Sequence, residues 1–199
     1  MYTIPVMSSG KYTLKLRSND LLTEDYNKEF NLIVLEDVKN LKFNDDKTIT
    51  FDNVEYAGKY DVFITNSNGN LIDAFSASST TINIENKISQ LAAGEYNITI
   101  YANSTDNYVF KSLFGSKLSF SVLSTPVVSL KNKELSWNAV SGATKYLIYK
   151  NNKYYGETTD LSFMDRSFEY GDQLYVVATS ESNNQFQSNK SNIVKILTI

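Results

Sequence analysis

The 199-residue chain contains no cysteine and no histidine. Without cysteine, disulfides and thiolate metal sites are excluded. Without histidine, the chain lacks the commonest general base and transition-metal ligand, so a conventional Ser-His-Asp triad is excluded as well. No nucleophile elbow, phosphate-binding loop or dinucleotide-binding glycine motif occurs. We therefore predict no catalytic residues, no metal site and no cofactor, and expect a protein that is not an enzyme.

The chain also has no large excess of charge of either sign and no long apolar run. The net charge is −3, the sequence pI is about 5.1, and the lysines are spread along the chain. Because no basic stripe is present, nucleic acid is not an expected partner. No apolar run approaches the roughly 20 residues that span a bilayer, so membrane insertion is not expected. The N-terminus also lacks the charged and apolar regions of a signal peptide. These features favour a fragment of an exported protein or a virion part assembled in the cytoplasm.

The residues that are abundant favour strands. The chain has 14 tyrosines, 11 phenylalanines and only 2 prolines. Aromatic and β-branched residues pack well on a pleated, half-buried surface. Short runs of alternating apolar and polar residues are separated by clusters of Asn, Gly, Ser and Asp. Several short strands with turn signals between them predict an all-β sandwich or barrel.

The chain also repeats itself. Residues 49–64 match residues 135–150 at a constant separation of 86 positions. A second pattern, a turn glycine followed by an alternating run, occurs at 94–102 and again at 171–178. Each copy ends in a last alternating run, at 118–122 and 193–196. The pairs matched at 86 positions are Phe51 with Trp137, Val54 with Val140, Ala57 with Ala143, and Tyr60 with Tyr146.

The N-terminal residues match only the second half of this repeat. Residues 10–16 correspond to the run that begins at Gly94, and residues 30–34 correspond to the last run. We therefore predict a partial β unit over 1–38, a first repeat over 39–124 and a second repeat over 125–199. Internal repetition of this kind is the sequence signature of a tandem array.

The only tryptophan is interpreted as a core residue. Each repeat of about 80 to 90 residues suits a seven-stranded sandwich. Trp137 shares a strand face with Leu135, because residues i and i+2 point to the same side. An indole at the centre of a small sandwich buries up to about 250 Å². We predict four core plugs, which are Phe51 and Tyr60 in the first repeat and Trp137 and Tyr146 in the second.

These residues carry a resemblance to a known family. The stretch "LSWNAVSGATKYLIYKNNKYYGET" resembles the fibronectin type III superfamily, especially its bacterial form, and "YVVATSESNNQFQSNKSNIVKI" is similar to that family's last two strands. The resemblance is close over 125–199 and looser over 39–124, where Phe51 replaces the tryptophan and Tyr56 a glycine. It implies tandem fibronectin type III-like β-sandwiches. It does not imply one function, because such domains serve as spacers, adhesins and ligand platforms.

Oxygen-rich turns are the remaining candidates for chemistry. Adjacent carboxylates occur at Glu24-Asp25, Glu36-Asp37 and Asp45-Asp46. Neighbouring residues on a strand face opposite ways, so we interpret these pairs as solvated turn residues. The stretches 44–46 and 66–70 contain oxygen ligands suitable for calcium, but neither matches the spacing of a known calcium loop.

A tyrosine-rich stretch is the strongest candidate for a binding surface. Tyr149, Tyr154 and Tyr155 offer large, stiff contact area for a sugar or a partner protein. The alternative is a hairpin with its turn at Asn151-Asn152, whose tyrosines alternate between the core and the sheet surface. Base rates for exposed aromatic residues favour this alternative.

Residues 1–38 allow three interpretations. They are the end of a truncated preceding domain, a segment that adds strands to a neighbouring subunit, or part of an enlarged first domain that is completed within the chain. Strands at 1–38 without partner strands would expose an apolar face, and the three interpretations differ in which part of the protein or of a neighbouring subunit covers it.

Two functional hypotheses follow. The first is a non-enzymatic structural or adhesive module, a spacer or protein-binding surface on a bacterial cell surface or a phage virion, with a protein partner or self-assembly. The second is a carbohydrate-binding accessory region of a larger surface enzyme, with a glycan as ligand.

Overall fold

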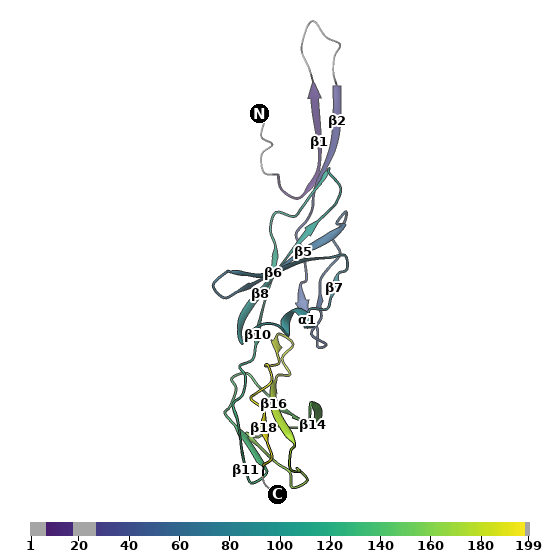
Figure 1. The fold of residues 1–199 in the computed structure, drawn as a ribbon. Coiled ribbons are helices and arrows are strands. Elements are labelled where there is room, and N and C mark those ends of the chain that lie inside the picture. Colours follow the sequence, from purple (N-terminus) through teal and green to yellow (C-terminus); the bar gives the residue numbers. More distant parts are fainter. Residues whose placement is uncertain (1–6, 18–26, 198–199) are drawn as a thin grey trace. The chain divides into compact units, whose positions relative to one another are not determined.

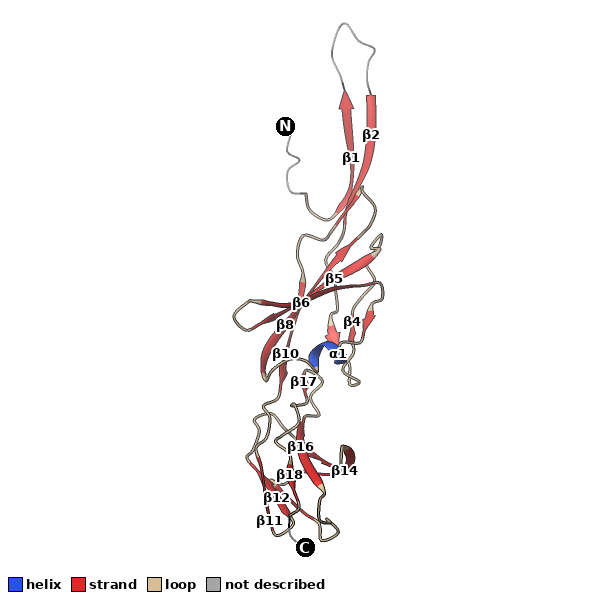
Figure 2. Ribbon diagram, viewed as in Figure 1, coloured by secondary structure: helices blue, strands red, loops and turns tan. Residues whose placement is uncertain are grey.

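A computed structural model describes residues 7–17 and 27–197 of the chain. Strands dominate this part of the chain, as Figure 2 shows, so the all-β prediction is confirmed. Met1 and the Glu24-Asp25 pair lie outside the described residues. No helix within the described ranges has the length and apolar character needed to cross a membrane.

Strands occur throughout the described part of the chain, from Gly10 to Lys195 (Figure 1). Before the helical turn they are β1 (Gly10–Arg17), β2 (Asn27–Val34), β3 (Lys42–Phe43), β4 (Ile49–Thr50), β5 (Lys59–Asn66), β6 (Leu71–Ala77) and β7 (Thr81–Ile82). After α1 (Glu85–Ile88) come β8 (Gly94–Asn103), β9 (Val109–Phe110), β10 (Ser116–Val122), β11 (Val128–Lys131), β12 (Glu134–Trp137) and β13 (Lys145–Lys150). The last are β14 (Lys153–Thr158), β15 (Ser162–Met164), β16 (Gln173–Thr179), β17 (Gln185–Phe186) and β18 (Val194–Lys195).

Contacts divide the chain into two compact units. The first comprises residues 1–42, 49–82 and 97–118, and the second comprises 43–48, 83–96 and 119–199. This division does not follow the limits of the predicted repeats, because β8 and β10 contribute residues to both units. The boundaries at 38 and 124 therefore stay a prediction.

The first unit contains the N-terminal hairpin. β1 and β2 pair antiparallel along their whole length, from Gly10 with Val34 to Arg17 with Asn27. The short strand β9 adds to β2 in parallel, which makes a three-stranded sheet. On one face of β1, Tyr12 and Leu14 are half-buried and Leu16 is exposed. This face is therefore only partly covered within the described residues.

β5 and β6 form a second hairpin in the first unit. Along β5, Tyr60, Val62 and Ile64 are buried and alternate with half-buried residues. The turn is closed by Asn66, whose side-chain oxygen accepts hydrogen bonds from the backbone N–H groups of Asn68 and Asn70. The asparagine-rich stretch 66–70 thus uses Asn66 to stabilise a turn, as expected for such sequences.

The strand order repeats between the two halves of the chain. The first repeat has the sheets β3-β4-β7 and β10-β8-β5-β6, and β17 extends the second of these beyond β10. The second repeat has the sheets β11-β12-β15 and β14-β13-β16-β18. The two-residue strands β9 and β17 are left out of the strand numbering of the repeats, because each pairs with a strand outside its own repeat. With this numbering, the first, second and fifth strands of each repeat form one sheet, and the third, fourth, sixth and seventh form the other.

Residues from both sheets build the core of the second repeat. Leu135 and Trp137 come from β12, and Ile148, Leu174 and Val176 come from the facing sheet. Burial of large apolar side chains between two sheets is the main driving force for folding of such a sandwich. The complete buried cluster is Leu123, Val128, Leu135, Trp137, Val140, Tyr146, Ile148, Phe168, Leu174, Val176, Ala178 and Ile196.

The helical turn α1 was not anticipated from the sequence. The backbone N–H of Glu85 donates to the side chain of Asn83, and Ile88 is buried. A four-residue turn is too short for a periodic apolar pattern to reveal it.

A close packing position in the first unit gives a stability prediction. A Cβ atom on Gly115 would lie 2.7 Å from Cε2 of Tyr101 and still closer to the side chain of Thr99. We expect Gly115→Ala to lower the free energy of unfolding by about 1–3 kcal/mol, because overpacking forces neighbouring side chains apart. The measurement is a urea titration against wild type. Gly156→Ala is the control, since its Cβ would meet only ordinary contacts, at 3.7 Å from Phe163; an equal loss in both variants would contradict the packing explanation.

An ion pair at the start of β16 gives a pH prediction. Asp172 is buried and lies 2.8 Å from the ammonium of Lys150. It also accepts hydrogen bonds from the side chain of Asn151 and the backbone of Glu169, each at 2.8 Å. Although burial opposes ionisation, these partners together lower the pKa of Asp172 below its ordinary value of 3.8. A lowered carboxyl pKa contributes stability that is present above the ordinary pKa and is lost as pH falls through the folded value.

We therefore expect Asp172→Asn to destabilise the protein at pH 7 by about 1–3 kcal/mol, by loss of charge-assisted hydrogen bonds. The difference from wild type should shrink as pH falls below 3.8, the ordinary pKa. Urea titrations at several pH values test this, with the exposed Asp160→Asn as the control. A pH-independent difference would exclude the ionised carboxylate as its source.

Candidate functional site

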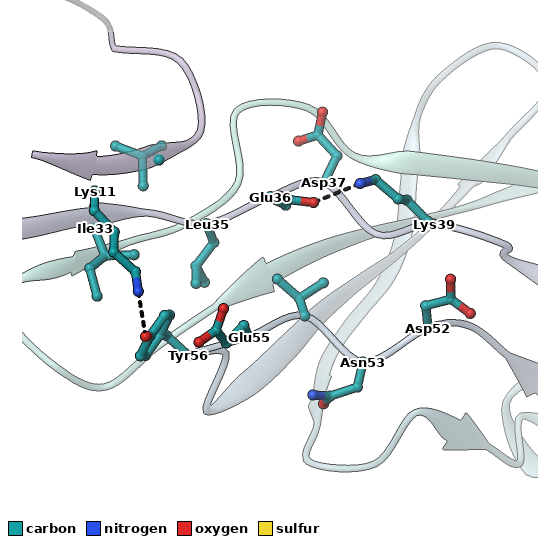
Figure 3. Close-up of a pocket in the computed structure, with 13 residues that line it drawn as sticks. Lys11, Ile33, Leu35, Glu36, Asp37, Lys39, Asp52, Asn53, Glu55 and Tyr56 are labelled. Carbon is teal, nitrogen blue, oxygen red and sulfur yellow. Dashed lines mark hydrogen bonds and ion pairs between the residues drawn. The ribbon is translucent and has the colours of Figure 1, made fainter.

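A groove in the first unit is lined by acidic and basic side chains. Figure 3 shows this groove, which has a volume of about 370 Å³. The ammonium of Lys39 lies 2.6 Å from the carboxylate of Glu36, and Lys11 donates a hydrogen bond of 2.7 Å to the hydroxyl of Tyr56. The lining residues are Gly10, Lys11, 33–37, Lys39 and 52–56.

The carboxylates of the groove serve local structure. Asp37 accepts a hydrogen bond from the backbone N–H of Phe114 at 2.9 Å, and Asp52 accepts one from Asn40 at 2.6 Å. The hydrogen bond from Lys39 lowers the pKa of Glu36, so this carboxylate is not poised as a proton carrier near neutral pH. In the described part of the chain, no three acidic residues are grouped so that they would hold a metal ion.

Tyr56 connects the groove to the repeat pattern. Its φ of 66° is in the left-handed region, where Gly142, 86 positions later, has a φ of 83°. The chain thus makes the same turn in both repeats, although a tyrosine in this region is strained. The ammonium of Lys11 lies 4.7 Å from the centre of the Tyr56 ring, and their hydrogen bond raises the pKa of Lys11. The strained turn at Tyr56 is therefore in contact with Lys11 of the N-terminal hairpin.

The structure divides the three predicted contact tyrosines between two faces. Asn151 and Asn152 form the tight hairpin turn between β13 and β14, with φ values of 53° and 63°, so the predicted turn is confirmed. Tyr155 packs toward the core, where its ring lies 5.6 Å from Phe168, and its hydroxyl donates to Asp165.

Tyr149 and Tyr154 lie on the other face of the same sheet. The rings of Tyr149 and Tyr175 stack at 4.8 Å with an angle of 6°, and Tyr154 meets Tyr149 edge-on at 6.1 Å. We call Tyr149, Tyr154 and Tyr175 the tyrosine face. Tyr175 was missed from the sequence, although it alternates with the buried residues Leu174 and Val176 and so had to point outward.

The tyrosine face borders a second groove, of about 260 Å³, within the second unit. The residues that line it include Tyr149, Tyr175 and Val177 from β13 and β16, together with Ile88 and Leu91 from α1 and the segment that follows it. Burial raises the pKa of Tyr175 and of Tyr154, so both phenols are neutral at physiological pH and can donate hydrogen bonds. This combination of stacked rings and polar edges has the composition of a small-molecule or peptide contact site.

The four predicted core plugs are brought together in two equivalent pairs. The plug rings lie 4.7 Å apart in the first repeat and 5.4 Å apart in the second. In each pair the tyrosine hydroxyl accepts a hydrogen bond from a backbone N–H, that of Val54 at 3.1 Å or that of Val140 at 2.9 Å. The pairs are Phe51 with Tyr60 and Trp137 with Tyr146, and all four residues are buried.

Two short parallel strand pairs are built in the same way. In the first junction, β9 lies on β2: Ile33 N–H donates to the carbonyl of Tyr108 at 2.9 Å, and Leu35 N–H donates to that of Phe110 at 3.0 Å. The first junction thus joins the loop after the sixth strand of the first repeat to the end of the N-terminal hairpin.

In the second junction, β17 lies on β10. Ser121 N–H donates to the carbonyl of Asn184, and Leu123 N–H to that of Phe186, both at 3.0 Å. This is the same pattern as in the first junction, one repeat later. Because it occurs twice, it is a property of the repeat and not of one loop sequence.

A serine fixes the loop in each junction. Ser112 N–H donates to the carbonyl of Ala102, whose N–H donates back to the serine hydroxyl. Ser188 and Ala178 make the same two bonds, at 2.9 and 3.0 Å. The loop is thereby held to the sixth strand two residues after its junction strand ends.

The division of seven strands into sheets decides the fold. In both repeats, strands one, two and five form one sheet and strands three, four, six and seven form the other. This is the two-sheet sandwich that immunoglobulin and fibronectin type III domains share, but the fourth strand lies beside the third, whereas constant-type immunoglobulin domains place it beside the fifth. The chain has a tandem fibronectin type III-like fold.

No protein-family profile and no curated protein sequence matches the chain. Solved structures do. A two-domain fibronectin type III segment of chicken tenascin matches at 14% identity and a TM-score of 0.35, over 80% of this chain and 99% of that one. Domains d3-d4 of the rat CD45 extracellular region match at 13% identity and a TM-score of 0.37, over 61% and 68%. The BSP domain of a biofilm associated protein matches at 17% identity and a TM-score of 0.28, over 82% and 28%. At these values, the fold rests on the strand order described above.

In the second junction, aromatic packing reinforces the backbone bonds. Phe186 is buried, and its ring lies 5.5 Å from Phe43 and 5.4 Å from Phe120. The Phe186 ring is therefore enclosed by side chains from β3 and β10.

Lys47 closes the second junction from the turn between β3 and β4. Its ammonium donates to the carbonyls of Ser182 at 2.8 Å and Gln185 at 2.6 Å, and lies 5.3 Å from the centre of the Phe186 ring. Burial lowers the pKa of Lys47, but carbonyl dipoles and the ring face both attract its charged form. No isolated pattern in the sequence marks this lysine, because its partners are more than 130 positions away.

Proposed function

We propose that the chain is a non-catalytic spacer and protein-binding module, built from a partial unit over 1–38 and fibronectin type III-like modules over 39–124 and 125–199. The observation that carries this proposal is the repeated junction. Interfaces between domains usually permit relative motion. Here each junction extends a sheet edge with backbone hydrogen bonds, so it restrains bending between successive modules. It also covers an edge that would otherwise be open to other chains.

The setting proposed for this spacer is a bacterial cell surface or a phage virion. A string of restrained modules suits a part that holds another domain at a distance or presents an adhesive surface. The half-buried apolar face of β1, with Tyr12, Leu14 and Leu16, supports a further role of the 1–38 segment in self-assembly.

Nuclear magnetic resonance relaxation tests whether the two repeats move as one restrained unit, as the spacer proposal requires. Backbone ¹⁵N relaxation of the full chain is measured at Ile64 and Ile148, which are buried in the first and second repeats. We expect one common anisotropic tumbling for both. The substitution Phe186→Ala should give the two repeats separate correlation times. Independent tumbling in the wild-type chain would refute the spacer.

Light scattering tests the assembly role of the N-terminal segment. We expect residues 1–199 to form an oligomer and residues 39–199 to be monomeric, because the latter lack the apolar hairpin face. If both proteins are monomeric, self-assembly through residues 1–38 is refuted, whereas the spacer role is unaffected.

A carbohydrate-binding role is the second candidate, and the tyrosine face favours it. Stacked aromatic rings beside a groove are suited to a sugar ring. On a glycan array, Tyr149→Ala and Tyr154→Ala should each abolish binding, whereas Tyr170→Ala, at an exposed tyrosine outside this face, should preserve it. Absence of binding by the wild-type chain would exclude this candidate.

A further inference from the structure

The end of the second repeat presents an edge equivalent to the two that the junctions cover. Leu35 and Leu123, the last donors of the two junctions, are 1% and 3% exposed. Like Leu35 and Leu123, Leu197 directly follows a buried aliphatic residue, here Ile196, but Leu197 is 70% exposed. The equivalent leucine is therefore covered in both junctions and exposed at the end of the second repeat.

The backbone N–H groups at this edge are oriented like those of residues 33–35 and 121–123 in the two junctions. Ile196 N–H donates to the carbonyl of Asp172 at 3.0 Å, beside β16. Successive N–H groups of a strand point to opposite edges. Those of Lys195 and Leu197 therefore point away from β16, in the direction from which junction loops bind elsewhere in the chain.

The lysine that closes the second junction also has an equivalent here. Lys133 lies 86 positions after Lys47, at the turn between the first two strands of its repeat. Its φ of 62° matches the 64° of Lys47. Its ammonium donates to the carbonyl of Arg166 at 3.1 Å. An ammonium has three protons, so further carbonyl groups can be bound beside this one.

We propose that residues 195–197, together with Lys133, form a docking site for the loop between the sixth and seventh strands of a further module of this type. This inference rests on the proposed function. The occupant is defined by the two loops already seen, Tyr108–Ser112 and Asn184–Ser188. It is an extended pair of residues with an apolar second member. The carbonyl of the residue before the pair and the carbonyl of the second member accept the two strand N–H groups. A serine two positions later fixes it to its own sixth strand.

The test extends the full chain. Residues 1–199, labelled with ¹⁵N, are joined to an unlabelled copy of residues 126–199. Pro126 then follows Leu197 by the same three positions that separate it from Leu123. We expect hydrogen exchange of the Leu197 amide to slow roughly tenfold or more relative to the unextended chain, because the new loop bonds it.

Matched variants identify the contact. Phe186→Ala in the appended copy alone should abolish the slowing at Leu197, whereas the same substitution in the labelled part alone should preserve it. Lys133→Met in the extended chain should reduce the slowing. A sample labelled only in the copy reports its folding through Ile148.

Three results would overturn the proposal. One is unchanged Leu197 exchange beside a folded copy, and another is a copy that fails to fold in this position. The third is concentration-dependent slowing of Leu197 in the unextended chain, which would assign the edge to another part of a second copy. Leu123 in the same spectra separates the two proposals: fast exchange there would refute the spacer junction, whereas slow Leu123 with fast Leu197 would refute only this docking site.

Discussion

Replacing Trp137 with alanine is expected to lower the free energy of unfolding by about 3–5 kcal/mol, the range for large aromatic truncations in cores. Trp137 is 7% exposed and packs at 5.4 Å against Tyr146, inside the cluster that joins the two sheets. Its loss leaves a cavity that a sandwich clamped by strand pairing cannot close. Urea unfolding followed by circular dichroism measures the effect. A loss below about 1 kcal/mol would show that the indole does not hold the sandwich together.

The control is Trp137→Phe, which should cost much less. Phe51 fills the same position of the first repeat, so a benzyl side chain is compatible with this fold. The indole Nε1 is buried, with no hydrogen-bond partner among the described residues. Removing an unsatisfied buried donor recovers part of the packing loss. A phenylalanine variant as unstable as the alanine variant would mean that the indole shape, and not apolar volume, is required.

The constant separation of 86 positions explains how much of the fold was predictable. It aligned Phe51 with Trp137 and Tyr60 with Tyr146, and both tyrosines make the same hydrogen bond to the turn. Period-two alternation is local, so strands such as β5 and β13 can be inferred from neighbouring residues alone. Their tandem arrangement then follows from the repetition.

The tyrosine stretch shows where local patterns fail. Tyr154 and Tyr155 are adjacent, so one faces outward and the other inward, but the pattern does not say which. The register between β13 and β14 shifts by a bulge at Ile148 and Tyr149. This irregularity places Tyr154 beside Tyr149 and turns Tyr155 toward Phe168. A bulge depends on pairing, and pairing is not written in either strand alone.

The junctions were beyond prediction for a related reason. β9 and β17 are only two residues long, so no alternation marks them. Their partners lie 76 and 64 positions earlier in the chain. Such pairing depends on where whole sandwiches place their edges. The serines at 112 and 188 are the only sequence signal, and they become recognisable only once the bonds to the sixth strand are known.

Replacing Phe186 with alanine is the second large expected effect, a loss of about 3–5 kcal/mol in unfolding free energy. The ring is 5% exposed, contacts Phe43 and Phe120, and lies under the ammonium of Lys47. Truncation removes these contacts and leaves the lysine above an apolar gap. Because the ring comes from one repeat and its neighbours β3 and β10 from the other, the loss should also speed hydrogen exchange of the Leu123 amide. Urea titration and exchange measurements together test both effects.

Phe110→Ala is the matched control for this junction. Phe110 has the same place in the first junction, and its carbonyl accepts the equivalent bond from Leu35, but its side chain is 45% exposed. We expect a loss within about 1 kcal/mol, since an exposed ring has little buried area to lose. The comparison separates the contribution of the backbone hydrogen bonds from that of side-chain packing, because the two junctions make the same backbone bonds and differ in the burial of the phenylalanine. If both substitutions cost the same, the backbone pairing would carry the junctions, and Lys47 and the phenylalanine cluster would be incidental to them.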